Sequence, residues 1–244
     1  MPYQTLIYAK KDHVASIKLN RPRAGNAIDQ ALAQELEEVC KLVNQDDDIY
    51  VVTLTGTGDA FCTGGEAGKK YHPAADIAAI EKPVVAAING DAIGQGLELA
   101  LGADIRIASS KAHFGLPQVT GGSMAADGGT QRLPRIVGRG KALELLMTAD
   151  TITAEEALDI GLISRVAPAE SLAEEAAKLA ETIAGKGPIA LRYLKEAIVK
   201  GMDMTLEQGL RLEADLYFLI HTTADRTEGI RSYLEKRKPE YKGK

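Results

Sequence analysis

The sequence predicts an α/β fold, with a layered core of strands and helices followed by a helical C-terminal part. Apolar strand-like runs such as "IYVVTLTG", "KPVVAAING" and "IRIAS" alternate with stretches of helical periodicity, which favours a layered core. From Ala154 onward, helical patterns follow one another with little interruption. A chain of 244 residues with 45% hydrophobic residues is long enough for one large domain or one and a half.

The N-terminal pattern indicates two strands and then a helix. Residues 5–20 alternate as two short strands around a turn at Lys10–Asp12, with Ala15, Ile17 and Leu19 on one face of the second strand. Asp29 is a candidate N-cap for the helix that follows. The apolar residues at helical spacing in that helix are Leu32, Leu36, Val39, Leu42 and Val43.

The C-terminal part carries more apolar surface than one core needs. Helical patterns cover residues 153–162, 170–186, 188–202 and 206–220. The apolar positions of the last pattern are Leu206, Leu210, Leu212, Leu216 and Leu219. We therefore expect part of this region to pack on the core or on a neighbouring subunit.

Composition excludes several classes of protein. The net charge is −5, from 29 basic and 34 acidic residues, so nucleic acid and anionic membranes are not expected partners. The two cysteines, Cys40 and Cys62, lack metal-site spacing, and the four histidines are scattered, so no metal site is expected. The N-terminus lacks a signal pattern, and no apolar run reaches about 18 residues. These features predict a cytoplasmic protein.

Two glycine-containing segments each follow a buried strand. They cover residues 60–68 and 89–108, and glycine lets a backbone approach a ligand closely. The second segment runs into a helix, whose first N–H groups have no intrahelical acceptor. If both segments face one point, their N–H groups form an oxyanion hole; otherwise the glycines simply make turns. The glycine spacing differs from a dinucleotide-binding fingerprint.

Three polar residues in apolar surroundings are candidates for chemistry. Glu98 lies in the first turn of an apolar helix, where it either has a function or faces solvent and interacts with the helix dipole. Gln118 can hold water but cannot transfer a proton near neutral pH, and it could instead satisfy loop backbone groups. Asp127 is either an acid of the site or the N-cap of the following helix.

Several motifs, in order along nearly the whole chain, resemble the crotonase (enoyl-CoA hydratase/isomerase) superfamily. They are "LNRPRAGNAID", "AFCTGGE", "AAINGDAIGQGLELALGADIRIAS", "AHFGLPQVTGG", "GGTQRLPRIVGRGKALELLMT", "TAEEALDIGLISRVAP" and the C-terminal "TEGIRSYLEKRKPEYKGK". The resemblance implies a ββα spiral core, an acyl-CoA thioester substrate, no separate cofactor, and trimers often paired into hexamers. We accordingly expect a core at residues 1–185 and a helical region at 186–244 for trimerisation and CoA contacts.

The resemblance also implies roles for individual residues. The oxyanion N–H groups fall on Gly65 and Gln95, although the second position is commonly glycine in the family. The family's first catalytic glutamate falls on Glu98 and its second on Gln118, while some branches place an aspartate near Asp127. We therefore name Glu98, Asp127 and Gln118 as catalytic candidates, with Gln118 transferring no proton. The implied substrate and CoA contacts are Arg23, Ala24, Thr63, Gly64, Gly94 and, towards a neighbouring subunit, Lys242.

The segment from Gly64 to Pro83 is shorter than is usual in the family, which indicates a reduced helix beside the acyl pocket. Within it, "KKYH" at residues 69–72 is either a basic stretch near the CoA phosphates or a solvated loop.

Three functions follow from these features. The first is a lyase that hydrates an enoyl-CoA or a conjugated or cyclic dienoyl-CoA. The second is a dienoyl-CoA isomerase or C–C bond hydrolase that uses Asp127. The third is a non-catalytic homologue that binds CoA or RNA, against which the acidic balance and Glu98 both argue.

Overall fold

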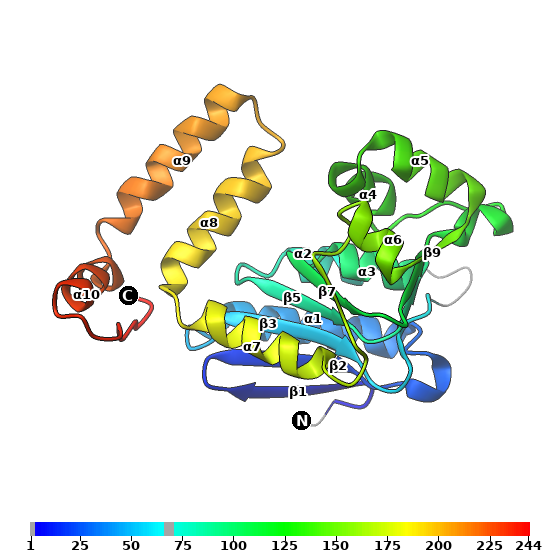
Figure 1. Ribbon diagram of the computed structural model, residues 1–244, viewed down its shortest axis with the longest axis horizontal. Helices are drawn as coiled ribbons and strands as arrows, with labels where there is room; N and C mark the ends of the chain where they lie inside the picture. The colour runs from blue at the N-terminus through cyan, green and yellow to red at the C-terminus, as the bar shows by residue number, and fades with distance from the viewer. Residues whose placement is uncertain (1–2, 66–70) are drawn as a thin grey trace.

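The computed structural model describes residues 3–65 and 71–244, and its core is a six-stranded sheet in the order β1-β2-β3-β5-β7-β10. Within this sheet β1 and β2 pair antiparallel, and the pairings β2–β3, β3–β5, β5–β7 and β7–β10 are parallel (Figure 1). The strands are β1 (Leu6–Lys11), β2 (Val14–Leu19), β3 (Val51–Gly56), β5 (Val84–Ile88), β7 (Ile105–Ser109) and β10 (Arg165–Ala167).

Helices cover both faces of this sheet because its strands are apolar on both sides. On β3, Val51 packs under α7 (Leu172–Ala184), whereas Val52 and Leu54 join the main core with α1 (Gln30–Gln45). The side chain of Asp29 accepts a hydrogen bond from the Leu32 N–H, so it caps α1 as predicted. The buried residues of α1 are Leu32, Ala33, Leu36, Val39, Cys40 and Val43.

A second, smaller sheet positions the glycine segments. Its strands are β4 (Ala60–Cys62), β6 (Asp91–Ile93), β8 (His113–Gly115) and β9 (Thr151–Thr153), in that order. The strands β4, β6 and β8 are parallel, so the segments that leave their carboxyl ends meet at one edge. The elements around this edge are η1 (Pro22–Ala24), α2 (Pro73–Ala78), α3 (Gln95–Leu101), η2 (Pro117–Gly121), α4 (Gly129–Val137), α5 (Arg139–Thr148) and α6 (Ala154–Asp159).

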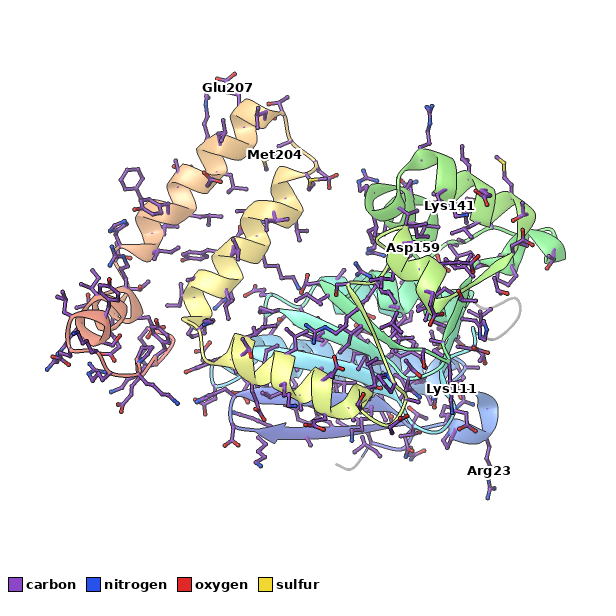
Figure 2. The ribbon with its side chains drawn as sticks, in the orientation of Figure 1. Arg23, Lys111, Lys141, Asp159, Met204 and Glu207 are labelled. Atoms are coloured by element: carbon purple, nitrogen blue, oxygen red, sulfur yellow. The ribbon has the colours of Figure 1, made fainter. Side chains whose placement is uncertain are left out.

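The last three helices extend away from the core (Figure 1). They are α8 (Pro188–Gly201), α9 (Leu206–Ile220) and α10 (Ala224–Leu234). Polar contacts tie α8 to the sheet, including a 2.7 Å ion pair between Lys195 and Asp104. Met204 and Glu207 mark the end of this extension that lies farthest from the sheet (Figure 2). None of the helices in the described part of the chain is long and apolar enough to cross a membrane.

Several details differ from the sequence-based expectations. The first turn lies at Asp12 and His13, both with positive φ, so β1 continues to Lys11. Leu42 is 38% exposed although it shares the helical spacing of its buried neighbours. The C-terminal part also contains β10, because a short apolar stretch there completes the edge of the sheet beside β7.

Candidate active site

The two glycine segments come together in the structure. Gly64 follows β4 with φ +123°, and Gly94 follows β6 with φ +59°. A Cβ placed on Gly94 would lie 3.9 Å from the Cα of Gly64. Both glycines therefore occupy backbone conformations that L side chains rarely adopt, at a point where two backbones nearly touch.

The two candidate donors lie immediately beyond these glycines. Gly65 is exposed, and the preceding Gly64 carbonyl accepts a 2.8 Å hydrogen bond from the Ile28 N–H. Gln95 is the first residue of α3, so its N–H belongs to the first turn, where no intrahelical acceptor exists. The structure thus brings Gly65 and Gln95 to the same edge of the second sheet.

Glu98 is 2% exposed, so the alternative of a solvent-facing helix acid is wrong. Its Oε1 accepts hydrogen bonds from the backbone N–H groups of Asp127 at 2.7 Å and Gly129 at 2.9 Å. Burial raises the pKa of this carboxyl above 4.5, while the two backbone donors partly oppose the increase. Glu98 is therefore a fixed carboxyl whose proton is held more tightly than that of an exposed glutamate.

Asp127 is not the N-cap of the following helix. The cap residue of α4 is Gly128, and no side chain caps this helix. The buried Asp127 carboxylate instead contacts α2. Its Oδ2 accepts a 2.9 Å hydrogen bond from the Ala74 N–H in the first turn of that helix. Burial raises its pKa above 3.8, and Ala74, His72, Arg132 and Gln95 each act in the opposite direction.

Gln118 contacts Glu98 rather than loop backbone. Its Nε2 donates to Glu98 Oε2 at 3.2 Å, so the expectation of an amide that satisfies loop backbone groups is not met. Its Oε1 is buried and has no hydrogen-bond partner among residues 3–65 and 71–244. Buried acceptors normally have a partner, so this oxygen is suited to accept from a bound molecule.

The predicted CoA-side loop lies beside the first glycine segment. The Thr63 N–H donates to the Gly25 carbonyl at 3.0 Å, just after η1. Arg23 and Ala24 in η1 are exposed, and the Arg23 side chain points outward (Figure 2). A 2.7 Å ion pair from Arg21 to Asp29 fixes the loop against α1.

Lys242 is the one candidate that lies apart from the others within this chain. Its backbone N–H donates to Asp225 Oδ1 at 2.7 Å, beside α10. That region lies on the opposite side of the molecule from α4 and β9 (Figure 1). Any contact of Lys242 with CoA in a neighbouring subunit remains a prediction.

Sequence reasoning missed two residues that contact Asp127. His72 Nδ1 lies 3.7 Å from Asp127 Oδ1, and Arg132 Nη1 donates to the Asp127 carbonyl at 2.9 Å. No spacing signal links these residues with Glu98, although "GGTQR" could have directed attention to Arg132. Of the "KKYH" stretch, Lys69 and Lys70 lie outside the described residues, and His72 is exposed.

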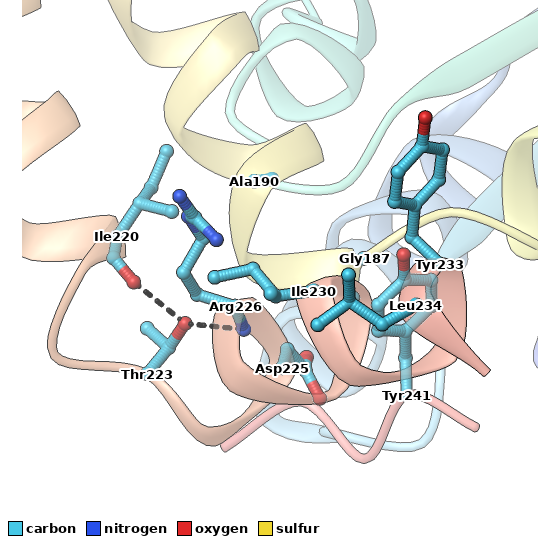
Figure 3. Close-up of a pocket in the computed structure, with 11 residues that line it drawn as sticks. Gly187, Ala190, Ile220, Thr223, Asp225, Arg226, Ile230, Tyr233, Leu234 and Tyr241 are labelled. Atoms are coloured by element: carbon cyan, nitrogen blue, oxygen red, sulfur yellow. Dashed lines mark hydrogen bonds between the residues drawn. The ribbon is translucent and has the colours of Figure 1, made fainter. Parts of the chain in front are cut away.

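A separate pocket lies within the helical extension. It has a volume of about 480 Å³ and lies between the start of α8, the end of α9 and α10 (Figure 3). Thr223 borders it and caps α10, accepting from the Arg226 N–H at 3.1 Å. The pocket contains none of the candidate carboxylates, so the catalytic candidates are identified by their geometry and not by the size of a cavity.

The two glycine segments meet close to Gln118, which contacts the buried Glu98 carboxylate. Backbone N–H groups and a carboxylate are the components of a site that stabilises an oxyanion next to a group that can exchange protons. The chain belongs to the enoyl-CoA hydratase/isomerase family, whose model matches residues 9–244. The crotonase-type α/β fold expected from the sequence is confirmed by solved structures.

Relatives and solved structures match over almost the full length. The crotonyl-CoA hydratase of Syntrophomonas wolfei is 40% identical, with 99% of each chain covered. The (E)-benzylidenesuccinyl-CoA hydratase of Thauera aromatica is 41% identical, covering 95% of this chain and 96% of that protein. The crystal structure of an enoyl-CoA hydratase from Bacillus anthracis is 40% identical, with a TM-score of 0.94 over 99% of this chain and 100% of the other.

Proposed function

We propose that the protein hydrates an α,β-unsaturated acyl-CoA thioester, either an enoyl-CoA or a conjugated or cyclic dienoyl-CoA. The observation that carries this proposal is the buried Glu98 carboxylate, fixed through Oε1 by two backbone N–H groups and contacted at Oε2 by Gln118. Similarity to proteins named crotonyl-CoA hydratase and (E)-benzylidenesuccinyl-CoA hydratase supports the reaction class.

The thioester carbonyl oxygen accepts hydrogen bonds from the N–H groups of Gly65 and Gln95. As water adds to the β-carbon, electron density moves onto this oxygen and an enolate forms. The two donors stabilise the enolate more than the neutral thioester, and removing one such donor typically costs about 2.7–4 kcal/mol of transition-state stabilisation. Arg23, Ala24, Thr63, Gly64 and Gly94 are proposed to contact the CoA side of the substrate, with Lys242 reaching the CoA of a neighbouring subunit.

Glu98 and Gln118 hold the attacking water, and Glu98 Oε2 accepts its proton as the C–O bond forms. Gln118 orients the water, because an amide cannot gain or lose a proton near neutral pH. The α-carbon of the enolate then takes a proton, which we assign to Asp127. The sum of these steps adds one water across the double bond and uses no separate cofactor. Glu98 returns its proton to Asp127, directly or through water, to complete the cycle.

A second candidate is isomerisation of a dienoyl-CoA or hydrolysis of a C–C bond in a CoA thioester. The observation that favours it is the second buried carboxyl, Asp127, because a pair of carboxyls can move a proton between two carbons without adding water. Product analysis by mass spectrometry over a panel of enoyl- and dienoyl-CoA thioesters separates hydration from isomerisation. Hydration adds the mass of one water, whereas isomerisation leaves the mass unchanged.

The pH dependence of kcat/KM should show a raised acid limb. Glu98 must be charged to accept a proton, and burial raises its pKa, so activity should fall as the pH drops through a value above 4.5. The charge of the Asp127 carboxylate also raises the pKa of Glu98, so the limb reports Glu98 together with its acidic neighbour. Initial rates across pH, corrected for unfolding, measure it, and a limb at or below 4.5 would contradict the assignment.

We propose that the protein assembles as a trimer or hexamer through its helical extension. Large apolar side chains of α8 and α9 are exposed in the single chain, including Leu206 at 81% and Phe218 at 70%. Apolar patches of this kind commonly mark protein–protein contacts. Sedimentation velocity at micromolar concentration should give a species at least three times the monomer mass, and a monomer would contradict the proposal.

A further inference from the structure

The Gln95 side chain occupies a space next to the first oxyanion segment. A Cβ added at Gly65 would collide with Gln95 Oε1, while its other near neighbour, the Ile28 carbonyl oxygen, lies 3.4 Å away. The φ of Gly65 lies outside the left-handed range, so the obstacle to a side chain at this position is the Gln95 amide. The two positions therefore compete for one volume.

The nitrogen of the Gln95 side-chain amide is also held in place. Gln95 Nε2 donates a 2.6 Å hydrogen bond to the carbonyl oxygen of Tyr71. The residues directly after Tyr71 contact Asp127. The Ala74 N–H donates to Asp127 Oδ2 at 2.9 Å, and His72 lies beside Oδ1. The segment Tyr71–Ala74 is thus fixed at one end to α3 and at the other to the candidate acid.

We propose that the Gln95 side chain is a positioning residue, which fills the space beside Gly65 and anchors the segment Tyr71–Ala74 so that the Gly65 N–H and the Asp127 carboxylate keep a fixed separation. This inference rests on the proposed function and extends it, because the proposed oxyanion role of Gln95 uses only its backbone N–H. Hydrogen bonding from the Gln95 amide also lowers the pKa of Asp127, which agrees with this arrangement.

A four-protein comparison tests the shared volume: the wild type, Gly65→Ala, Gln95→Gly and the double variant. Gly65→Ala should lower Tm when Gln95 is present, because the amide must leave the Tyr71 carbonyl. In the Gln95→Gly background the same change should leave Tm unchanged, because only the amide blocks the position. An equal loss of Tm in both backgrounds would overturn the proposal. This comparison needs no substrate, so it decides the packing even if no thioester is hydrated.

Gln95→Met tests the positioning itself. Methionine keeps the bulk beside Gly65 but cannot donate to Tyr71 or Asp127. We expect kcat to fall at least about tenfold with KM changed less, since general acid catalysis depends on the placement of the acid. Asp127 also loses a hydrogen-bond donor that favours its charged form, so its pKa should rise. Because Asp127 must be protonated to act as the acid, the alkaline limb of the kcat profile should shift to higher pH. A wild-type kcat and pH profile in Gln95→Met would overturn the proposal, whereas a wild-type protein inactive on every thioester would instead refute the proposed function.

Discussion

Glu98→Gln should lower kcat by about 10²–10⁴-fold, because the amide cannot accept a proton from the attacking water. The variant should fold normally. The new amide oxygen can accept from the N–H groups of Asp127 and Gly129, as Oε1 does in the wild type. The NH₂ group of the new glutamine then faces Gln118. The Gln118 amide can rotate so that its Oε1 accepts from this NH₂ group, because Gln118 Oε1 has no other partner in the described part of the chain. Steady-state kinetics with the preferred thioester measure the loss.

Stability separates a catalytic role of Glu98 from a structural one. Folding raises the pKa of Glu98, so the charged carboxylate is less favourable in the folded state than in the unfolded state. The contribution of Glu98 to the free energy of unfolding therefore declines as the pH rises from about 4.3, the unfolded-state value, through the folded-state pKa. Removing the charge should therefore leave Tm at pH 7 equal or higher. The exposed Glu155→Gln in α6 is the matched control and should keep full activity. Full activity in Glu98→Gln would refute its assignment as the base.

Asp127→Asn should lower kcat by about 10²–10³-fold with little change in Tm, because general acid catalysis is lost while the side chain keeps its shape. The asparagine oxygen can still accept from the Ala74 N–H, which is the contact that Asp127 gives to α2. An amide caps a helix about as well as a carboxylate, so the first turn of α2 stays satisfied. Kinetics and thermal unfolding of the same preparation provide both values.

Two further variants decide between catalysis and capping at this position. Asp127→Ala removes the acceptor for Ala74 and should lose about 0.5–2 kcal/mol of stability in addition to the activity. Asp159→Asn, at the exposed end of α6, controls for a change of surface charge (Figure 2). If Asp127→Asn remains fully active and only Asp127→Ala is impaired, Asp127 is a structural cap of α2, and Glu98 works without it.

The elements with strong local signals could be predicted from the sequence. The alternation of Ala15, Ile17 and Leu19 gives a strand with these three side chains buried, and Asp29 caps α1 as its position suggested. The convergence of the glycine segments could also be anticipated, because each follows a buried strand and parallel strands end at a common edge. These features depend on periodicity and on glycine conformation, which are properties of short stretches.

The contacts that define the carboxylates could not be predicted in this way. The partner of Asp127 is Ala74, which lies 53 positions away in sequence, and Glu98 accepts from residues that lie 29 and 31 positions away. No local pattern indicates that the Asp127 side chain accepts a hydrogen bond from α2 and does not cap α4. The stretch "ADGG" is typical of the start of the helix that follows it. The role of the Gln95 side chain likewise depends on Gly65 and Tyr71, which reach it only through the fold.

Hydration with Glu98 as the base is tested most directly by running the reaction in heavy-oxygen water and locating the label. The wild type, given the thioester that it turns over fastest, should yield a product heavier by one labelled water, with the heavy oxygen on the β-carbon. Glu98→Gln, at equal concentration and folded by thermal unfolding, should form this product about 10²–10⁴-fold more slowly. A product of unchanged mass, or labelled product formed at the wild-type rate by Glu98→Gln, would contradict the account.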